Sequence, residues 1–347
     1  MTRLTLYDIA LRFREPLVTA AGTYPERRSA IVALEIDGVT GWGEAATMPS
    51  GAWGSIKEVW DQLAKNRPIG VGPASAALQA ARADCAAKSA GLPLWRHLGA
   101  SGRAVAARVT FGLHDSPEAL VAAVQRVADT GVTAVKIKIA PGRDLLQIAA
   151  VRSGFPDLDI SVDANGAYGS PDDPVFGDLD ELGVGLIEQP FPPGNLAASS
   201  ALRSRVDMAV CLDEAIRSPQ DASAAIAAGA ADVLSLKIGR LGLEISREIL
   251  AIASDVGVGI KAGGTFDTAI GRHLILAFAG LPGVVDAEAG PPDAYLVDPP
   301  GRYPAIVKGM ITPDPGPGMG DVISRDLLEQ IAIRSLEVGS VGRGARG

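Results

Sequence analysis

Short apolar runs rich in β-branched residues recur along the chain from about residue 105 onward. A turn and an Ala/Leu-rich amphipathic stretch separate each run from the next, with a repeat of roughly 25 residues. Strands that alternate with helices predict βαβ units in a parallel sheet, and eight such strands predict a TIM-type barrel. The eight runs are Ala107–Leu113, Ala134–Ile139, Ile160–Ala164, Val184–Glu188, Ala209–Asp213, Val233–Ile238, Val258–Ala262 and Val284–Glu288.

The first 103 residues do not follow this repeat. Leu4–Phe13 and Ser29–Ile36 alternate like antiparallel strands, and helical patterns follow at Trp53–Ala64 and Ala74–Ala90. This combination predicts an α+β domain that precedes the barrel.

After Glu288 the chain becomes rich in Pro and Gly and loses its helical period. We therefore expect an α/β protein built on a (β/α)7β-type TIM barrel over residues 104–292. Residues 1–103 form the α+β domain, and residues 293–347 return to that domain and complete it. The final six residues, Gly-Arg-Gly-Ala-Arg-Gly, are expected to be disordered.

Composition narrows the function classes. The chain has 347 residues, of which 47% are hydrophobic, and its net charge is −8 without any run of Lys or Arg. This charge argues against nucleic acid as a partner. The cysteines Cys85 and Cys211 lack CxxC spacing, which indicates a reducing compartment. No apolar stretch is long enough to span a bilayer, so we expect a cytoplasmic protein without membrane contact.

Three consecutive predicted strands end in carboxylates: Asp163, Glu188 and Asp213. Barrel active sites lie at these strand ends, and adjacent strands are about 5 Å apart, so the three side chains should converge. Any one of them could be a helix N-cap or an ion-pair partner. Three in succession favour a divalent cation, and Mg²⁺ suits such an oxygen-rich, open site. Glu214 is a second choice as a ligand.

The lysines supply the complementary charge. Only eight of the 32 basic residues are lysines, yet Lys136 and Lys138 share one face of a strand and Lys237 ends another. Burying ammonium groups is costly without compensating charge. Unlike Arg, a buried Lys near other positive charge and a metal can have its pKa lowered toward neutrality, which suits a general base. Salt bridges to neighbouring carboxylates are the structural alternative.

Ordered motifs in the barrel half resemble those of the enolase superfamily, within its muconate lactonizing enzyme subgroup. The similarity extends over nearly the whole chain. It is greatest to the branch of o-succinylbenzoate synthases and N-succinylamino acid racemases. The motifs are Lys-Ile-Lys at 136–138, Val-Asp-Ala-Asn-Gly-Ala-Tyr at 162–168, Ile-Glu-Gln-Pro-Phe at 187–191, Leu-Asp-Glu-Ala at 212–215, Leu-Lys-Ile-Gly-Arg-Leu-Gly at 236–242 and Gly-Gly-Thr-Phe-Asp-Thr-Ala-Ile-Gly-Arg at 263–272.

The resemblance implies roles for individual residues. Asp163, Glu188 and Asp213 would bind Mg²⁺, with Mn²⁺ as a substitute. Lys138 would be the acid/base, Lys136 its electrostatic neighbour, and Lys237 the group on the opposite face of a small carboxylate substrate. The first domain would cap the site, with the segment Thr19–Arg28 as a mobile loop and Thr47–Trp53 as its companion. The implied substrate-binding residues are Asn165, Thr265, Phe266, Thr23 and Gly22.

The implied chemistry is removal of a proton α to a carboxylate through an enediolate, the pairing of Lys base and Mg²⁺ described for this superfamily. The expected overall reaction is the o-succinylbenzoate synthase dehydration of menaquinone biosynthesis. N-succinylamino acid racemase, muconate cycloisomerase and dipeptide epimerase are alternatives in the same subgroup. Thr265, Phe266 and Asp267 depart from the synthase pattern, and Lys261 is unexpected.

Two hypotheses from other functional classes remain open. A Schiff-base lyase would use a buried Lys as nucleophile without metal, and a non-catalytic barrel could bind an acidic metabolite. We also expect a homo-oligomer, a dimer or an octamer.

Overall fold

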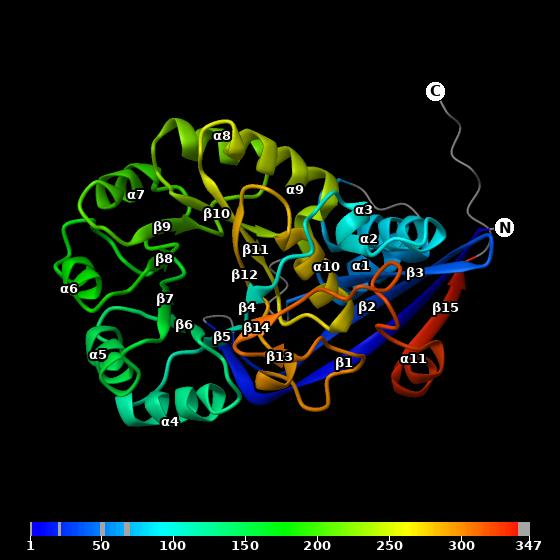
Figure 1. The fold of residues 1–347 in the computed structure, drawn as a ribbon, viewed down its shortest axis with the longest axis horizontal. Coiled ribbons are helices and arrows are strands. Elements are labelled where there is room, and N and C mark those ends of the chain that lie inside the picture. The colour runs from blue at the N-terminus through cyan, green and yellow to red at the C-terminus, as the bar shows by residue number, and fades with distance from the viewer. Residues whose placement is uncertain (1, 20–21, 49–52, 66–69, 339–347) are drawn as a thin grey trace.

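Eight parallel strands form the larger sheet of the computed structural model, which describes residues 2–19, 22–48, 53–65 and 70–338 (Figure 1). The strand order is β12-β11-β10-β9-β8-β7-β6-β5, and no pairing joins β12 to β5 in these ranges. The sheet is therefore a barrel that is open on one side. Its strands are β5 (Arg108–Phe111), β6 (Ala134–Lys138), β7 (Asp159–Asp163), β8 (Leu186–Glu188), β9 (Ala209–Leu212), β10 (Val233–Lys237), β11 (Gly259–Gly263) and β12 (Val284–Ala287).

One helix follows each of the first seven strands and covers the outside of the barrel (Figure 1). Several begin where the sequence provides a cap: Ser116 and Ser218 accept from backbone amides at the start of α4 and α8, each with Pro at the first helical position. The arrangement confirms the (β/α)7β barrel. The helices are α4 (Pro117–Ala128), α5 (Leu145–Gly154), α6 (Val175–Glu181), α7 (Leu196–Arg203), α8 (Pro219–Ala227), α9 (Ile238–Ser254) and α10 (Ala269–Ala279).

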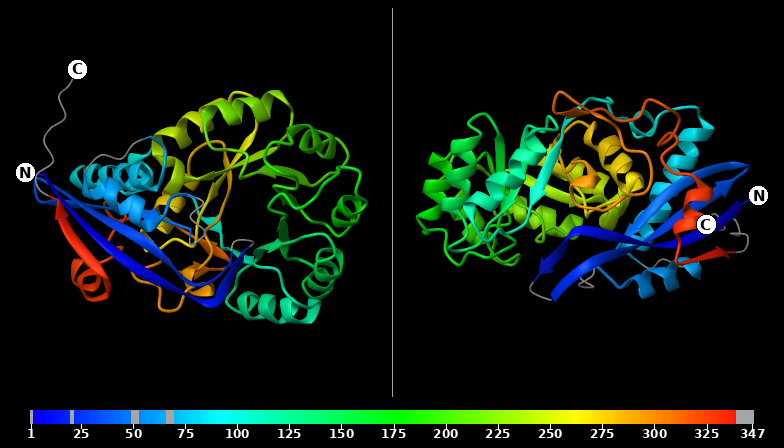
Figure 2. Two further views of the ribbon diagram at one scale, coloured as in Figure 1. Left: turned by 180° about the vertical axis from the view of Figure 1, so that it is seen from behind. Right: turned by 90° about the horizontal axis from the view of Figure 1, so that it is seen from below.

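A second, antiparallel sheet lies beside the barrel and forms the capping domain (Figure 2). Its order is β15-β1-β2-β3, with α1 (Ile56–Ala64), α2 (Pro73–Ser89) and α3 (Leu94–His97) in the same domain. The sheet and α2 pack closely because Gly41 and Gly43 have no side chain. A Cβ on Gly43 would lie 1.9 Å from the carbonyl oxygen of Ala77. The strands are β1 (Thr2–Thr19), β2 (Gly22–Ile36), β3 (Val39–Ala46) and β15 (Arg334–Val338).

The chain after β12 returns to the capping domain, as expected. It forms η1 (Pro292–Ala294), then β13 (Ile306–Val307) and β14 (Met310–Ile311), which join β4 (Val105–Ala106) in a small sheet. The expectation that no helix follows Glu288 is wrong. Helix α11 (Arg325–Ile331) forms there, with Ser324 as its N-cap. Strand β15 then pairs with β1 and completes the sheet. The expected disordered tail lies outside the described residues.

The expected mobile loop is largely a strand. Gly22 and Thr23 belong to β2, where they pair with Thr19 and Val18 of β1, and residues 20–21 lie outside the described ranges. The rest of this segment, up to Arg28, is also part of β2. It pairs with β1 even where its side chains are exposed. Of the companion segment Thr47–Trp53, residues 49–52 are likewise outside the described ranges, and Trp53 stacks on Arg240 at the barrel.

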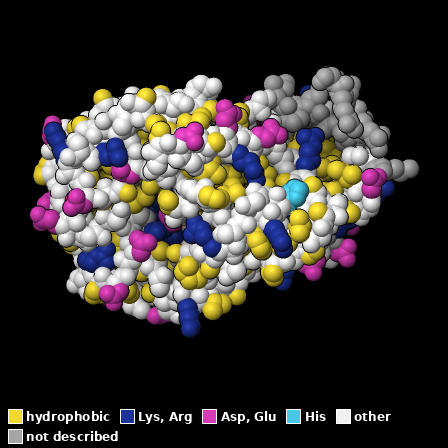
Figure 3. Space-filling model, turned by 45° about the horizontal axis from the view of Figure 1, so that its top comes forward, with side chains coloured by type: hydrophobic (Ala, Val, Ile, Leu, Met, Phe, Trp, Pro, Cys, Tyr) yellow, Lys and Arg dark blue, Asp and Glu magenta, His cyan; other side chains and the backbone are white. Residues whose placement is uncertain are grey.

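Surface charge is mixed. On the face shown in Figure 3, basic and acidic side chains are interspersed rather than separated by sign. None of the helices in the described ranges has the length and apolar character that a bilayer crossing requires.

Candidate active site

Strand register brings the three predicted carboxylates to one edge of the barrel. Asp163 and Glu188 are direct partners across β7 and β8, and Asp213 follows β9. Because side chains alternate along a strand, these carboxylates point into the barrel while residues such as Val162 and Ile187 pack outward. Asp163, Glu188 and Asp213 are 3%, 0% and 6% exposed. Buried carboxylates so close together require positive charge.

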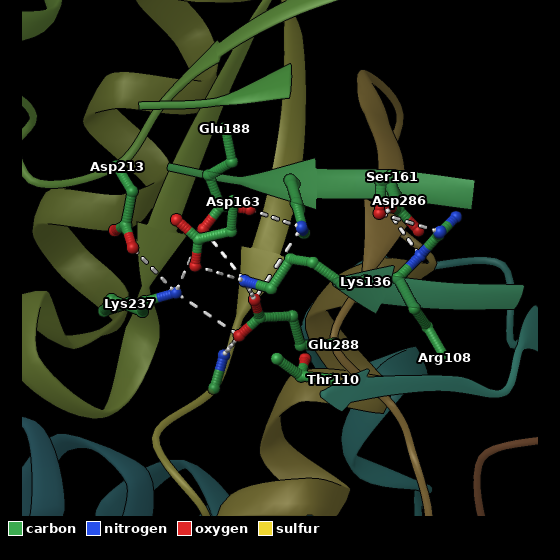
Figure 4. Close-up of polar contacts among 12 residues, drawn as sticks. Arg108, Thr110, Lys136, Ser161, Asp163, Glu188, Asp213, Lys237, Asp286 and Glu288 are labelled. Carbon is green, nitrogen blue, oxygen red and sulfur yellow. Dashed lines mark hydrogen bonds and ion pairs between the residues drawn. The ribbon is translucent and has the colours of Figure 1, made fainter. Parts of the chain in front are cut away.

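Two of the predicted lysines lie between these carboxylates (Figure 4). Lys136 Nζ is 3.0 Å from Glu188 Oε1 and 3.5 Å from Asp163 Oδ2. Lys237 Nζ is 3.0 Å from Asp213 Oδ2 and 3.9 Å from Glu188 Oε1. Each ammonium group therefore bridges two neighbouring carboxylates, so the ion pairs that the sequence left as a structural alternative do form.

Lys138 is the more accessible member of the pair on β6. Its side chain is 31% exposed, compared with 5% for Lys136. Its Nζ lies 3.1 Å from Asp163 Oδ2 and also donates to Asn165 Oδ1. Asn165 in turn donates to Glu214 Oε1 at 2.8 Å. Lys138 is thus oriented by two partners while its ammonium group remains open to a bound molecule.

The structure adds two residues to which the sequence analysis gave no role in the site. Glu288 follows β12, accepts from Lys136, and places Oε2 3.3 Å from Lys237 Nζ. Lys261 on β11 is fully buried, and its Nζ is 2.7 Å from Glu188 Oε2. The sequence does contain a signal for Glu288, because this residue ends the eighth predicted strand as Asp163, Glu188 and Asp213 end theirs. These groups form the barrel-mouth cluster: Lys136, Lys138, Lys237, Lys261, Asp163, Glu188, Asp213 and Glu288.

The pKa values of Lys136 and Lys237 are both raised. Burial disfavours the charge on Lys136, but the carboxylates of Glu188 and Glu288 outweigh it and raise the pKa of Lys136 well above its usual value. Burial likewise opposes the charge on Lys237, and Asp213 and Glu288 reverse the effect, so its pKa is also raised. The pKa values of Lys136 and Lys237 are raised because each of these ammonium groups contacts several carboxylates.

Asp213 differs from the other carboxylates. Burial raises the pKa of Asp213 to about 7, although Lys237 opposes the shift. Its Oδ1 is buried and has no hydrogen-bond partner. By contrast, the pKa of Glu188 is lowered, because Lys136 and Lys261 outweigh the effect of its burial. Asp213 is therefore the member of the cluster with an acceptor oxygen still free.

A divalent cation is compatible with the donor atoms of the cluster. In the described ranges, no three Asp, Glu, His or Cys side chains are arranged about one point as metal ligands would be. Lys136 and Lys237 form ion pairs with the carboxylates instead. The three carboxylates nevertheless supply only oxygen donors, which hard cations prefer, and Asp213 Oδ1 is unused. The three carboxylates therefore present a donor set that suits such a cation.

The predicted substrate-side residues are only partly brought together. Arg27 of the capping domain donates to the Thr265 carbonyl oxygen at 2.8 Å. Phe266 adopts φ 51° and packs edge-on against Phe13 and Tyr295, with ring centroids 5.2 Å and 5.4 Å apart. This loop follows β11 and borders the site. Gly22 and Thr23 lie on β2, where they pair with Thr19 and Val18 of β1.

Comparisons with known proteins agree with this geometry. Residues 119–327 match the family described as enolase C-terminal domain-like. The o-succinylbenzoate synthase of Geobacillus kaustophilus is 29% identical over 355 residues, 94% of each chain. The N-succinylamino acid racemase of Thermus thermophilus is 31% identical over 304 residues, 81% of this chain and 82% of that protein. A solved structure described as a probable mandelate racemase from Alicyclobacillus acidocaldarius has a TM-score of 0.85 at 30% identity, covering 97% of this chain and 98% of that one.

Proposed function

The chain belongs to the enolase superfamily, and on that premise we propose that it removes a proton α to the carboxylate of a small acid. The observation that carries the proposal is the position of Lys138. Its ammonium group is partly exposed at the end of β6, 3.1 Å from Asp163, beside the fully enclosed Lys136. A general base needs both a held orientation and access to its substrate.

A divalent metal is general among members of this superfamily. We propose Mg²⁺, with Mn²⁺ as a substitute, held by Asp163, Glu188 and Asp213. Bound there, the cation would offset the negative charge that develops on the substrate carboxylate. The unused Asp213 Oδ1 supports this assignment.

The three lysines then have different roles in the reaction. Lys138 takes the α-proton, and Asn165 holds its ammonium group in place between transfers. Lys136 stays protonated beside Glu188 and Glu288 and contributes fixed positive charge. Lys237 lies at the end of β10, on the opposite side of the site. It can donate a proton to the substrate or stabilise the enediolate from that face.

The overall reaction proposed is the dehydration carried out by o-succinylbenzoate synthase. Support comes from relatives of that name that match this chain over 94% of its length. In this reaction Lys138 would remove the α-proton and then help the hydroxyl group leave as water, while Lys237 remains a cation.

N-succinylamino acid racemase is the second candidate. Lys237 has a side chain 13% exposed, so it too is open to a bound molecule from the opposite strand. Two accessible lysines from β6 and β10 are what inversion of a stereocentre needs, because one removes the proton and the other returns it.

We also propose that the protein acts in the cytoplasm as a homo-oligomer, with a small carboxylate and no nucleic acid as its partner. Both cysteines are free and buried, which suits a reducing compartment.

The test is proton exchange in D₂O with Mg²⁺, followed by NMR, with N-succinyl amino acids of either hand, beside a dehydration assay on the cyclohexadiene carboxylate. Fast dehydration with little exchange supports the synthase, and exchange with inversion supports the racemase. Exchange that survives both EDTA and Lys138→Ala contradicts the proposal. Lys57→Ala, at a lysine 82% exposed on α1, is the matched control and should change neither rate. A covalent adduct trapped by borohydride would instead indicate a Schiff-base lyase.

A further inference from the structure

Lys261 is a member of the barrel-mouth cluster to which the proposed reaction gives no role. Its neighbours on β11, Ile260 and Ala262, belong to the hydrophobic core, so strand alternation turns Lys261 into the barrel. Its Nζ lies 2.7 Å from Glu188 Oε2 and 3.7 Å from Glu288 Oε1. The side chain is 0% exposed, so it contacts other members of the cluster and presents no surface to a bound molecule.

The two carboxylate oxygens of Glu188 face different groups. Its Oε1 lies 3.0 Å from Lys136 Nζ and 3.9 Å from Lys237 Nζ. The same two ammonium groups lie 3.5 Å from Asp163 Oδ2 and 3.0 Å from Asp213 Oδ2, respectively (Figure 4). Oε1 is therefore on the side of the other two proposed metal ligands, whereas Oε2 accepts from the lysine of β11.

The contact between Lys261 and Glu188 occupies Oε2 firmly. A hydrogen bond from an ammonium group to a carboxylate is about twice as strong as one between neutral groups. Water does not reach this contact, because both side chains are 0% exposed. A carboxylate can bind a cation through one oxygen or through both. With Oε2 occupied, Glu188 offers a cation only Oε1.

We propose that Lys261 is a positioning residue that restricts Glu188 to one oxygen for the bound cation and thereby leaves a coordination position for the substrate carboxylate. The inference rests on the proposed function, which supplies both the cation and the substrate. Mg²⁺ demands near-octahedral coordination, so every extra protein oxygen displaces a water molecule or a substrate oxygen. Replacing Lys261 by Met frees Oε2, and we expect this oxygen then to bind the cation as well.

Water-proton relaxation with Mn²⁺ tests this inference, because it reports how many water molecules the bound ion carries, independently of turnover. We expect about one water molecule fewer on Mn²⁺ bound to Lys261→Met than on Mn²⁺ bound to the unmodified protein. A merely structural lysine predicts the opposite, since a loosened Glu188 would leave more water on the ion. An equal or larger number of water molecules in Lys261→Met would therefore overturn the inference.

Lys138→Met is the matched control for the loss of charge. It removes the same charge 3.1 Å from another proposed ligand, Asp163. Loss of positive charge alone strengthens cation binding in both variants, but only Lys261→Met should change the number of water molecules on the ion. The same decrease in Lys138→Met would show that charge, and not the contact with Glu188, is responsible, and would also overturn the inference.

A crystal structure of the unmodified protein with Mn²⁺ decides the question even if Lys261→Met does not fold, because anomalous scattering locates the ion. We expect Glu188 to bind it through Oε1 alone, with Oε2 still within hydrogen-bond distance of Lys261 Nζ. Binding through both oxygens would overturn the inference and leave the proposed function intact. Mn²⁺ that does not bind at this cluster would instead overturn the proposed metal chemistry, and the inference with it.

Discussion

Arg27 Nη2 lies 2.5 Å from Glu44 Oε1, and both side chains are almost completely buried between the capping domain and the barrel. The two side chains of this pair hydrogen-bond to the two ends of the loop after β11. Arg27 donates to the Thr265 carbonyl, and Glu44 Oε2 accepts from the amide and hydroxyl of Thr268 at 2.9 Å and 2.6 Å. The capping domain therefore fixes the loop that borders the barrel-mouth cluster.

Glu44→Ala should destabilise the protein strongly, because it leaves Arg27 buried without its counter-ion and removes the acceptor of Thr268. Removing one partner of a buried ion pair costs about 3–5 kcal/mol. The free energy of unfolding in urea measures this cost. Asp61→Ala is the matched control, since Lys57 and Asp61 form an exposed i,i+4 pair worth about 0.3–0.5 kcal/mol. Equal losses in the two variants would contradict the role given to Glu44.

Gly271 allows this close approach of the domains, so Gly271→Ala should be destabilising. A Cβ there would lie 2.6 Å from Asp267 Cβ and 2.9 Å from Glu44 Oε2. We expect a loss of about 1–3 kcal/mol from overpacking. Gly177→Ala, in helix α6 with no atom within 4 Å of the added Cβ, should instead stabilise by about 0.5–1 kcal/mol. Thermal unfolding of both variants tests this, and a gain in Gly271→Ala would show that the interface can relax.

The barrel could be predicted from the sequence because each buried strand carries its own signal. Every apolar run is short, and a helix follows each of the first seven. Several of these helices have a recognisable start, as at Ser116 and Ser218. The first hairpin was harder, because residues such as Glu15 and Thr23 are exposed where β1 and β2 extend beyond the core. The pairing of this outer part depends on backbone hydrogen bonds, which leave no hydrophobic alternation to detect.

The candidate site was predictable as a set of residue types and not as a network of charges. Strand-end position identified Asp163, Glu188 and Asp213, and strand alternation placed Lys136 inside. The carboxylate partners of the lysines come from the ends of four strands, β7, β8, β9 and β12, which meet only in the folded barrel. The raised lysine pKa values and the involvement of Glu288 and Lys261 follow from that meeting.

Asp213→Asn should weaken Mg²⁺ binding by at least about tenfold, because it removes a negative charge and one of the two oxygens. Isothermal titration with MgCl₂ measures this independently of turnover. Asp61→Asn, on the exposed face of α1, is the control and should bind like the unmodified protein. An unchanged affinity in Asp213→Asn would exclude Asp213 as a ligand and leave its free Oδ1 unexplained.

The two accessible lysines should differ in the face of the substrate that they serve. If the protein is the racemase, Lys138→Ala should abolish α-proton exchange of one hand of an N-succinyl amino acid in D₂O, and Lys237→Ala that of the other, because the lysines reach the cluster from β6 and β10. Loss of a positioned general base lowers the rate about 10²–10⁴-fold. NMR of each pure enantiomer separates the two half-reactions. If Lys237→Ala retains exchange of both hands but loses dehydration, Lys237 acts only as a cation, and the synthase is favoured over the racemase.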